Sequence, residues 1–232
     1  MDTHETVVMS VGGSIIVPNH IDTDFLLSLK NLIEHQISAF GRRFIIITGG
    51  GMTARRYQEA ASTVSDLDPE DLDWMGIHAT RLNGHLLRTI FRDIAYPEMI
   101  TNPDDILRIP EESNLIIAAG YRPGASTDLR AVQIAIHRKS VRLMNLSNID
   151  YVYTADPRTD QNASKIENIS WEDFLTLIPR EWSPGLSSPF DPVAARLAHA
   201  NNIEVSVING KRVEDIEKYL NGETFMGTRI HA

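Results

Sequence analysis

Residues 44–57, FIIITGGGMTARRY, place an apolar run directly before three glycines and a segment that carries two arginines. The apolar residues predict a buried strand at 43–48, and the residues after the glycines predict a helix from Thr53 to about Val64. A strand that leads at once into a helix is the first half of a β-α-β unit. The stretch therefore predicts an α/β fold, and it raises the question of why three glycines stand between the two elements.

The same alternation continues along the chain. Strands that alternate with helices favour a mainly parallel sheet, and continuous apolar strands favour helices on both of its faces. Further strands are expected at 6–11, 114–120, 141–146 and 203–208. Further helices are expected at 22–40, 69–91, 126–137, 171–178, 191–201 and 212–220. The polar segment 147–168 and the Trp/Ser/Pro/Gly-rich segment 179–189 are predicted to be irregular.

Helix signals are clearest in the segment from residue 22 to residue 40. Asp22 or Thr23 is a suitable N-cap, and Gly41 is expected to end the helix. The apolar residues between them recur at helical spacing: Phe25, Leu26, Leu29, Leu32, Ile33 and Ile37.

Composition limits the classes of function. The chain has 232 residues and a formal charge of −9, which is unfavourable for binding long nucleic acids through their phosphates. Cysteine is absent, so disulfides, thiolate metal sites and cysteine nucleophiles are excluded. No apolar run approaches the roughly 18 to 20 residues that span a bilayer, and the first residues are acidic rather than basic. We expect a cytoplasmic protein without membrane or nucleic-acid partners, which could bind a small anion through local cations.

Glycines follow three of the predicted strands: Gly12-Gly13, Gly49–Gly51, and Gly120 with Gly124. Ligands of open α/β sheets bind beyond the carboxyl ends of the strands. Glycine there lets consecutive N–H groups point at a phosphate, and the next helix N-terminus adds a favourable dipole. Arg55 and Arg56 stand at that positive helix end, which makes sense if an anion binds between them. The plain alternative is a set of tight turns and a solvated Arg56.

Two common phosphate-binding patterns are missing. No GxxxxGK[ST] sequence occurs, which argues against a P-loop. No GxGxxG follows the first strand, which argues against a dinucleotide-binding fold. Any phosphate site must therefore be built from glycine-bearing strand ends of another kind.

Seven blocks, in this order and spacing, resemble those of the uridylate (UMP) kinases of archaeal and bacterial type, in the amino acid kinase family. The resemblance covers nearly the whole chain, and VYTADP and GIHATRLN are its most specific parts. The blocks are SVGGSII (10–16), GGGMTARRY (49–57), LDWMGIHATRLNGHLL (72–87), PGASTDLRA (123–131), DYVYTADPRTD (150–160), SSPFDPVAARLA (187–198) and GTRI (227–230).

The resemblance implies a three-layer αβα sandwich that transfers the γ-phosphate of ATP to UMP, with Mg²⁺ carried by the ATP. It implies one domain, 1–232, with an acceptor-binding lobe at about 1–140 and an ATP-binding lobe at about 141–232. It also implies a homohexamer, built as a trimer of dimers. Phosphoryl transfer requires alignment of donor and acceptor and positive charge around the migrating group.

On the ATP side, the resemblance places Gly12, Gly13 and Ser14 against the phosphates, with Gly51 and Arg55 beside them. It places Ser147, Tyr153 and Asp156 in the pocket for the base and ribose. Ser10 stands where many family members carry a lysine, so it is included in the ATP site, and more charge must come from elsewhere.

On the UMP side, the resemblance places Gly50 against the phosphate and Asp73 against the ribose hydroxyls. An ionised carboxylate suits that task because it only accepts hydrogen bonds. The acceptor loop, which we define as residues 121–127, is expected to wrap the base and phosphate. Its members are Tyr121, Arg122, Pro123, Gly124, Ala125, Ser126 and Thr127.

Arg55, Lys165 and Asp128 are the candidate catalytic residues by the same resemblance. Two of them have plainer interpretations: Lys165 can be a solvated surface residue, and Asp128, like Asp191, can orient basic groups or cap a helix. We assign no residue to a metal site, since His78 and His85 lie seven apart without a third ligand. Arg122, and Tyr151 in place of a glycine usual in the family, are departures that bear on nucleotide preference.

Two other functions stay open at this point. One is a sister kinase of the family that acts on another small acid or phosphate, although Asp73 favours an acceptor with a ribose. The other is a nucleotide-binding protein without useful turnover, similar to the molybdenum storage proteins. UMP kinase is the leading hypothesis.

Overall fold

The computed structural model describes residues 5–181 and 188–232. Its main sheet has seven strands in the order β3-β2-β1-β4-β8-β9-β7, and every neighbouring pair is parallel except β8 and β9. The strands are β1 (Thr6–Val11), β2 (Arg43–Thr48), β3 (Leu115–Ala118), β4 (Arg142–Ser147), β7 (Asn168–Ser170), β8 (Glu204–Asn209) and β9 (Thr228–His231). The prediction of a mainly parallel sheet is confirmed.

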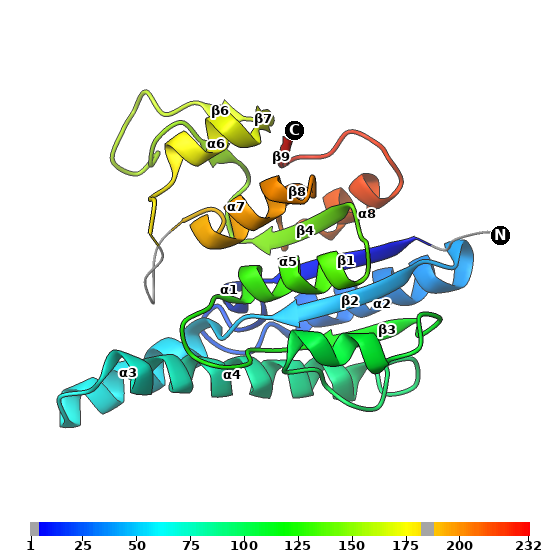
Figure 1. Ribbon diagram of the computed structural model, residues 1–232, viewed down its shortest axis with the longest axis horizontal. Helices are drawn as coiled ribbons and strands as arrows, with labels where there is room; N and C mark the ends of the chain where they lie inside the picture. The colour runs from blue at the N-terminus through cyan, green and yellow to red at the C-terminus, as the bar shows by residue number, and fades with distance from the viewer. Residues whose placement is uncertain (1–4, 182–187) are drawn as a thin grey trace.

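Helices cover both faces of this sheet. The helices are α1 (Gly13–Ile16), α2 (Thr23–Phe40), α3 (Gly51–Val64), α4 (Pro69–Ile90), the 3₁₀ helix η1 (Pro103–Arg108), α5 (Thr127–His137), α6 (Trp171–Leu177), α7 (Pro192–Ala200) and α8 (Val213–Leu220). One apolar core joins the sheet to α5, α6 and α7, and a second joins its other face to α1, α2, α4 and α8. Figure 1 shows α5 on the near side of the sheet and α2 on the far side. The three-layer αβα sandwich is confirmed.

Strand β1 illustrates why two cores form. Side chains of a strand alternate between its faces, so Val7 and Met9 enter the core beneath α2 while Val8 enters the core beneath α5. All three are buried. A strand that is apolar at every position is therefore stable only between two helical layers.

Helix α2 has the ends that its sequence predicts. The Asp22 carboxylate accepts a hydrogen bond from the Phe25 N–H at 3.0 Å, which caps the first turn. Gly41 adopts a left-handed conformation with φ 64° and donates back to the last turn of the helix. Its apolar stripe faces the core, as the spacing indicated.

Several boundaries differ from expectation. Helix α3 begins at Gly51 rather than Thr53, and Gly51 takes φ +62° at the turn out of β2. The segment 147–168 is not wholly irregular, since β5 (Val152–Tyr153) and β6 (Lys165–Ile166) pair as a small antiparallel sheet. Short elements such as η1, β7 and β9 have too few residues to give a periodic signal.

Parts of two sequence-based expectations fall outside the described residues. These are the loop at 182–187 and the acidic N-terminal residues 1–4. The division into lobes near residue 140 stays a prediction. No helix among the described residues is long and apolar enough to span a membrane.

Candidate functional site

The carboxyl ends of parallel strands meet at one edge of the sheet, where the arrowheads of β2 and β4 point left in Figure 1. We call this the carboxyl edge. Most of the predicted site residues lie at or directly after the strand ends that form it. They are Ser10, Gly12, Gly13, Ser14, Gly50, Gly51, Ser147 and the acceptor loop 121–127.

The glycines after β1 and β2 pack backbone against backbone. A Cβ on Gly13 would lie 1.9 Å from Gly51 N, and a Cβ on Gly51 would lie 2.1 Å from Gly13 O. A Cβ on Gly49 would lie 2.4 Å from Gly13 N. Glycine is therefore required here for the contact between the two loops, which brings the predicted ATP and UMP phosphate loops side by side.

Helix α4 supports the second glycine loop through a buried amide. Asn83 Nδ2 donates to the carbonyl oxygens of Gly49 at 2.8 Å and Gly50 at 3.3 Å. Asn83 is only 3% exposed, so these bonds satisfy an amide that would otherwise be buried at a cost. Asn83 was not among the residues predicted for the site, although a polar residue on the apolar face of a helix was a usable signal.

The same helix fixes the start of the acceptor loop. Thr80 Oγ1 accepts a hydrogen bond from Gly120 N at 2.8 Å. Arg81 donates from Nε to Gly120 O at 3.1 Å and from Nη2 to Tyr121 O at 2.8 Å. These residues were also missed, because their partners are backbone groups about 40 residues further along the chain.

Asp73 joins α4 to the middle of the acceptor loop. Its Oδ2 accepts a hydrogen bond from Gly124 N at 2.7 Å, and Gly124 adopts φ +83°. Asp73 is half-buried. The structure therefore brings Asp73 together with the loop that is predicted to hold the same acceptor.

Two helix N-termini lie at the carboxyl edge with different caps. Ser126 Oγ accepts from Leu129 N at 3.1 Å and so caps α5, whose first residue is Thr127. Helix α3 has Gly50 as its N-cap, without a capping side chain from the described residues or an acidic residue in its first turn. Its N-terminus keeps the positive end of the helix dipole available to an anion.

Arg55 lies exposed in the second turn of α3, and no hydrogen bond or ion pair joins its side chain to the rest of the described chain. Its neighbour Arg56 is exposed as well. An unpaired guanidinium close to an uncapped helix start is suited to contact a phosphate.

A group of two carboxyls and a hydroxyl lies where β1, α5 and α7 meet. Ser10 Oγ donates to Asp128 Oδ1 at 2.8 Å, and Asp191 N donates to Asp128 Oδ2 at 3.3 Å. Burial raises the pKa of Asp128 to about 6, and the nearby Asp191 carboxylate acts in the same direction. Asp191 also caps α7 by accepting from Ala194 N at 2.6 Å. The structure thus gives Asp191 its helix-capping role and makes Asp128 the partner of Ser10.

Lys165 and Tyr153 lie opposite each other on the β6–β5 pair. Figure 1 shows β6 beside β7 at the top of the view, whereas α3 lies at the bottom. Lys165 Nζ pairs with Glu167 Oε1 at 2.7 Å and lies 4.9 Å from the centre of the buried Tyr151 ring. The Glu167 carboxylate raises the pKa of Lys165. Among the described residues, the structure therefore joins Lys165 to Tyr151 and Glu167 rather than to Arg55 or the glycine loops.

Asp156 lies in the exposed connection between β5 and β6. Its carboxylate accepts from Arg158 N at 2.9 Å and from Arg158 Nη2 at 2.7 Å. The hydrogen bonds from Arg158 lower the pKa of Asp156 to about 2. Asp156 is thus an ionised carboxylate with an arginine partner.

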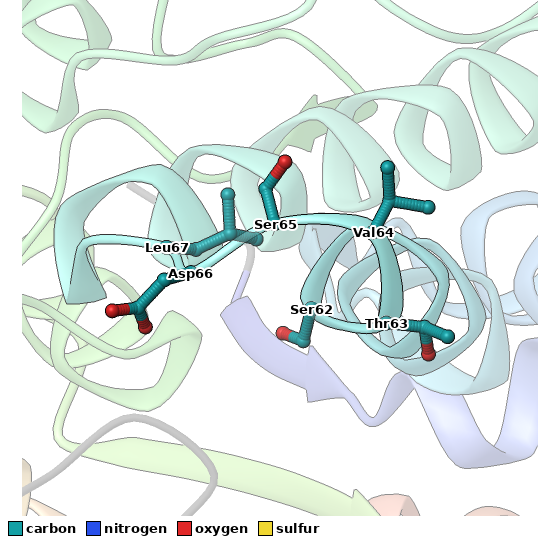
Figure 2. A pocket seen from close by; sticks show the side chains of 6 residues that line it. All are labelled: Ser62, Thr63, Val64, Ser65, Asp66 and Leu67. Carbon is teal, nitrogen blue, oxygen red and sulfur yellow. The ribbon is translucent and has the colours of Figure 1, made fainter.

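A hollow of about 430 Å³ lies at the turn between α3 and α4, and Figure 2 shows the side chains around it. Its lining has no basic residue, and its one ionisable group is Asp66, so it does not suit a phosphate. The lining residues are Ser62, Thr63, Val64, Ser65, Asp66 and Leu67. It is separate from the carboxyl edge and takes no part in the candidate site.

The sequence profile of the amino acid kinase family matches residues 5–209. The chain belongs to the amino acid kinase family. Among relatives, the uridylate kinase of Hyperthermus butylicus is 33% identical over 217 residues, covering 94% of both chains. The uridylate kinase of Pyrococcus abyssi is 31% identical over 211 residues, covering 88% of this chain and 90% of that protein.

Solved structures of the amino acid kinase family agree. The uridylate kinase from Archaeoglobus fulgidus superposes with a TM-score of 0.81 at 28% identity, covering 97% of this chain and 99% of that one. The UMP kinase from Ureaplasma parvum superposes with a TM-score of 0.80 and covers 99% of both chains. At 24% identity, this second likeness shows the fold alone. The resemblance to uridylate kinases within the family is confirmed.

The described residues contain no cluster of side chains that could hold a metal ion. Within residues 5–181 and 188–232, no three His, Asp or Glu side chains lie close enough together to hold a metal ion. At the carboxyl edge, both Asp73 and Asp128 already accept hydrogen bonds from the protein. This donor set suits a metal ion that arrives with nucleotide phosphates better than one held by the protein alone.

Proposed function

We propose that this chain is a UMP kinase, which transfers the γ-phosphate of ATP to UMP and yields ADP and UDP. The observation that carries the proposal is the backbone contact between the loop at Gly12–Ser14 and the loop at Gly49–Gly51. Two nucleotides bound at these loops would have their phosphates side by side. The similarity to uridylate kinases over nearly the full chain supports UMP as the acceptor.

On the acceptor side, Gly50 and the α5 N-terminus at Ser126 and Thr127 hold the UMP phosphate through N–H and hydroxyl groups. Asp73 keeps Oδ1 available for a ribose hydroxyl while Oδ2 binds Gly124 N. One carboxylate can do both because it has several lone pairs. Arg122 is exposed on the same loop and adds a cation near the acceptor phosphate.

On the donor side, Gly12, Gly13 and Ser14 face the ATP phosphates, with Gly51 and Arg55 close by. Ser147 at the end of β4, Tyr153 and Asp156 form the place for the base and ribose. Ser10 lies beside the proposed phosphate site, at the position where many family members carry a lysine. Its side chain is smaller than that of lysine and has no charge.

The reaction requires that ATP and UMP be aligned and that positive charge surround the migrating phosphoryl group. An oxygen of the UMP phosphate attacks the γ-phosphorus, and the bond from that phosphorus to the β–γ bridging oxygen breaks. Arg55 stabilises the charge on the migrating group, and Asp128 positions Ser10 at the end of β1. Lys165 would contact the phosphates only after releasing Glu167, so its role depends on breaking that ion pair when nucleotide binds. Mg²⁺ that arrives with ATP would add positive charge at the phosphates, beside the glycine loops and Arg55.

Several wider properties stay predictions. They are the homohexamer built from dimers, the cytoplasmic location and the role in pyrimidine nucleotide biosynthesis. Each follows from the resemblance to UMP kinases.

A coupled assay with purified protein, ATP and Mg²⁺ tests the activity against UMP, dUMP, CMP, GMP and AMP. The proposal predicts UDP formation with UMP far ahead of the others. Turnover of another acceptor in preference to UMP would favour a sister kinase of the family. Tight ATP binding without turnover of any monophosphate would favour a storage or regulatory protein.

A further inference from the structure

Arg130 is a nearly buried cation in the second turn of α5. Its side chain donates from Nη1 to Gln133 Oε1 at 3.0 Å and reaches the Arg122 carbonyl oxygen from Nη2 at 3.5 Å. The residue is 7% exposed, and Nε is buried without a hydrogen-bond partner among the described residues. The guanidinium therefore lies directly behind the acceptor loop, and the side chain that it bonds to is neutral.

Two arginines lie close together beside Tyr121. The Cζ atoms of Arg122 and Arg130 each lie 5.5 Å from the centre of the Tyr121 ring. Burial lowers the pKa of Arg130, and the charge of Arg122 lowers it further. Asp104 opposes this effect, but its carboxylate is exposed to solvent and bonds to His137 Nε2 at 3.1 Å. Solvent therefore screens the Asp104 charge, while the Arg130 guanidinium is nearly buried.

A buried charge without a close counter-ion destabilises a protein unless another group offsets it. A glutamate at position 133 would give Arg130 a counter-ion, but the residue there is Gln133, whose amide is neutral. A dianionic phosphate in the acceptor loop would provide it when bound. The helix dipole acts in the same direction, because Arg130 N bonds to Ser126 O at 3.3 Å and so belongs to the first turns of α5.

We propose that Arg130 is a specificity-determining residue, whose uncompensated charge behind the acceptor loop selects acceptors that carry a dianionic phosphate. The inference rests on the proposed function and deepens it. Arg130 acts through space and through the loop, so it is a positioning charge rather than a catalytic residue. A purely structural role, in contrast, would depend only on its hydrogen bonds and its contact with Tyr121.

Three substitutions separate charge from structure. Gln133→Glu keeps the hydrogen bond to Arg130 and the packing but gives the guanidinium a counter-ion. Arg130→Lys keeps the charge and loses the planar fork. Arg130→Gln removes both. Arg92→Gln, at an exposed site near the amino end of β3, is a control with the same change in net charge as Gln133→Glu.

The measurements are kcat and the KM values for UMP and ATP, with thermal unfolding as a check of folding. We expect Gln133→Glu to raise KM for UMP roughly tenfold, while KM for ATP, kcat and stability stay near the parent values. Arg130→Lys should raise KM for UMP less than Gln133→Glu does, and Arg92→Gln should change nothing.

The opposite result overturns the inference. If Gln133→Glu leaves KM for UMP unchanged while Arg130→Lys raises it, only the hydrogen bonds of Arg130 matter. A folding defect of Arg130→Gln leaves the Gln133→Glu result decisive. If the parent protein phosphorylates UMP and Gln133→Glu is silent, the inference fails and the proposed function stands. If the parent protein has no activity toward UMP, the proposed function itself fails.

Discussion

Gly13 and Gly51 lie back to back at the carboxyl edge, so close that a methyl group on either would overlap the backbone of the other. The two residues come from loops after neighbouring parallel strands, β1 and β2. This contact shows that packing between the two loops already requires glycine between β2 and α3. Access of phosphate to the backbone is a consequence of the same lack of side chains.

Substitution of Gly51 by alanine tests this contact. The new Cβ would lie 2.1 Å from Gly13 O, and the residue would be held at φ +62°, so we expect a loss of at least about 3 kcal/mol in the free energy of unfolding. Gly222→Ala is the control, since Gly222 has φ +76° but nothing within 4 Å of the methyl group that alanine would add. It should cost about 1 kcal/mol. Equal losses in urea unfolding would show that strain alone, and not the loop contact, sets the effect.

Asp73→Ala should affect the acceptor more than the donor. Loss of the carboxylate removes the bond to Gly124 N and the proposed bond to the ribose, so KM for UMP should rise roughly ten- to hundredfold. KM for ATP should change little. Steady-state kinetics with each substrate varied in turn measures both values, and similar increases in the two would remove Asp73 from the acceptor site.

Arg55→Ala should act mainly on turnover. Its guanidinium is free of partners in the described chain and is proposed to stabilise charge on the migrating phosphoryl group, so kcat should fall on the order of a hundredfold. Arg56→Ala, the adjacent exposed arginine, is the matched control and should stay within about twofold. Parent-like turnover of Arg55→Ala would exclude this residue from the mechanism.

The raised pKa of the half-buried Asp128 carboxyl predicts a pH dependence of stability. Its folded pKa, about 6, lies above the ordinary value of 3.8, so the folded state holds this proton more tightly than the unfolded state. The resulting stabilisation is present below about pH 4 and is lost as pH rises to about 6. Asp128→Asn should remove this loss, which is on the order of 3 kcal/mol. Urea unfolding at several pH values measures the difference between the two proteins, and a difference that does not change with pH would contradict the assignment.

Sequence-based prediction succeeded where the signal is local. Helix α2 could be predicted with its ends because Asp22, the apolar stripe and Gly41 all lie within one continuous segment. The buried strands were recognisable because both their faces are apolar. The strand ends, and therefore the residues at the carboxyl edge, followed from these elements.

Prediction failed where a partner comes from elsewhere in the chain. The role of Asn83 depends on carbonyl groups of Gly49 and Gly50, more than 30 residues away, and no periodic pattern encodes that contact. Lys165 differs, because the structure pairs it with Glu167 only two residues along the chain, and its contact with a phosphate stays a prediction. Contacts such as those of Asn83 are decided by tertiary packing that local sequence patterns do not contain.

A crystal structure of the protein with UMP and a non-hydrolysable ATP analogue tests the central claim most directly. We expect the UMP phosphate at Gly50 and the start of α5, and the ATP phosphates at Gly12–Ser14, with the γ-phosphate next to the UMP phosphate across the paired glycine loops. Nucleotides bound away from the carboxyl edge, or with their phosphates too far apart for direct transfer, would contradict it.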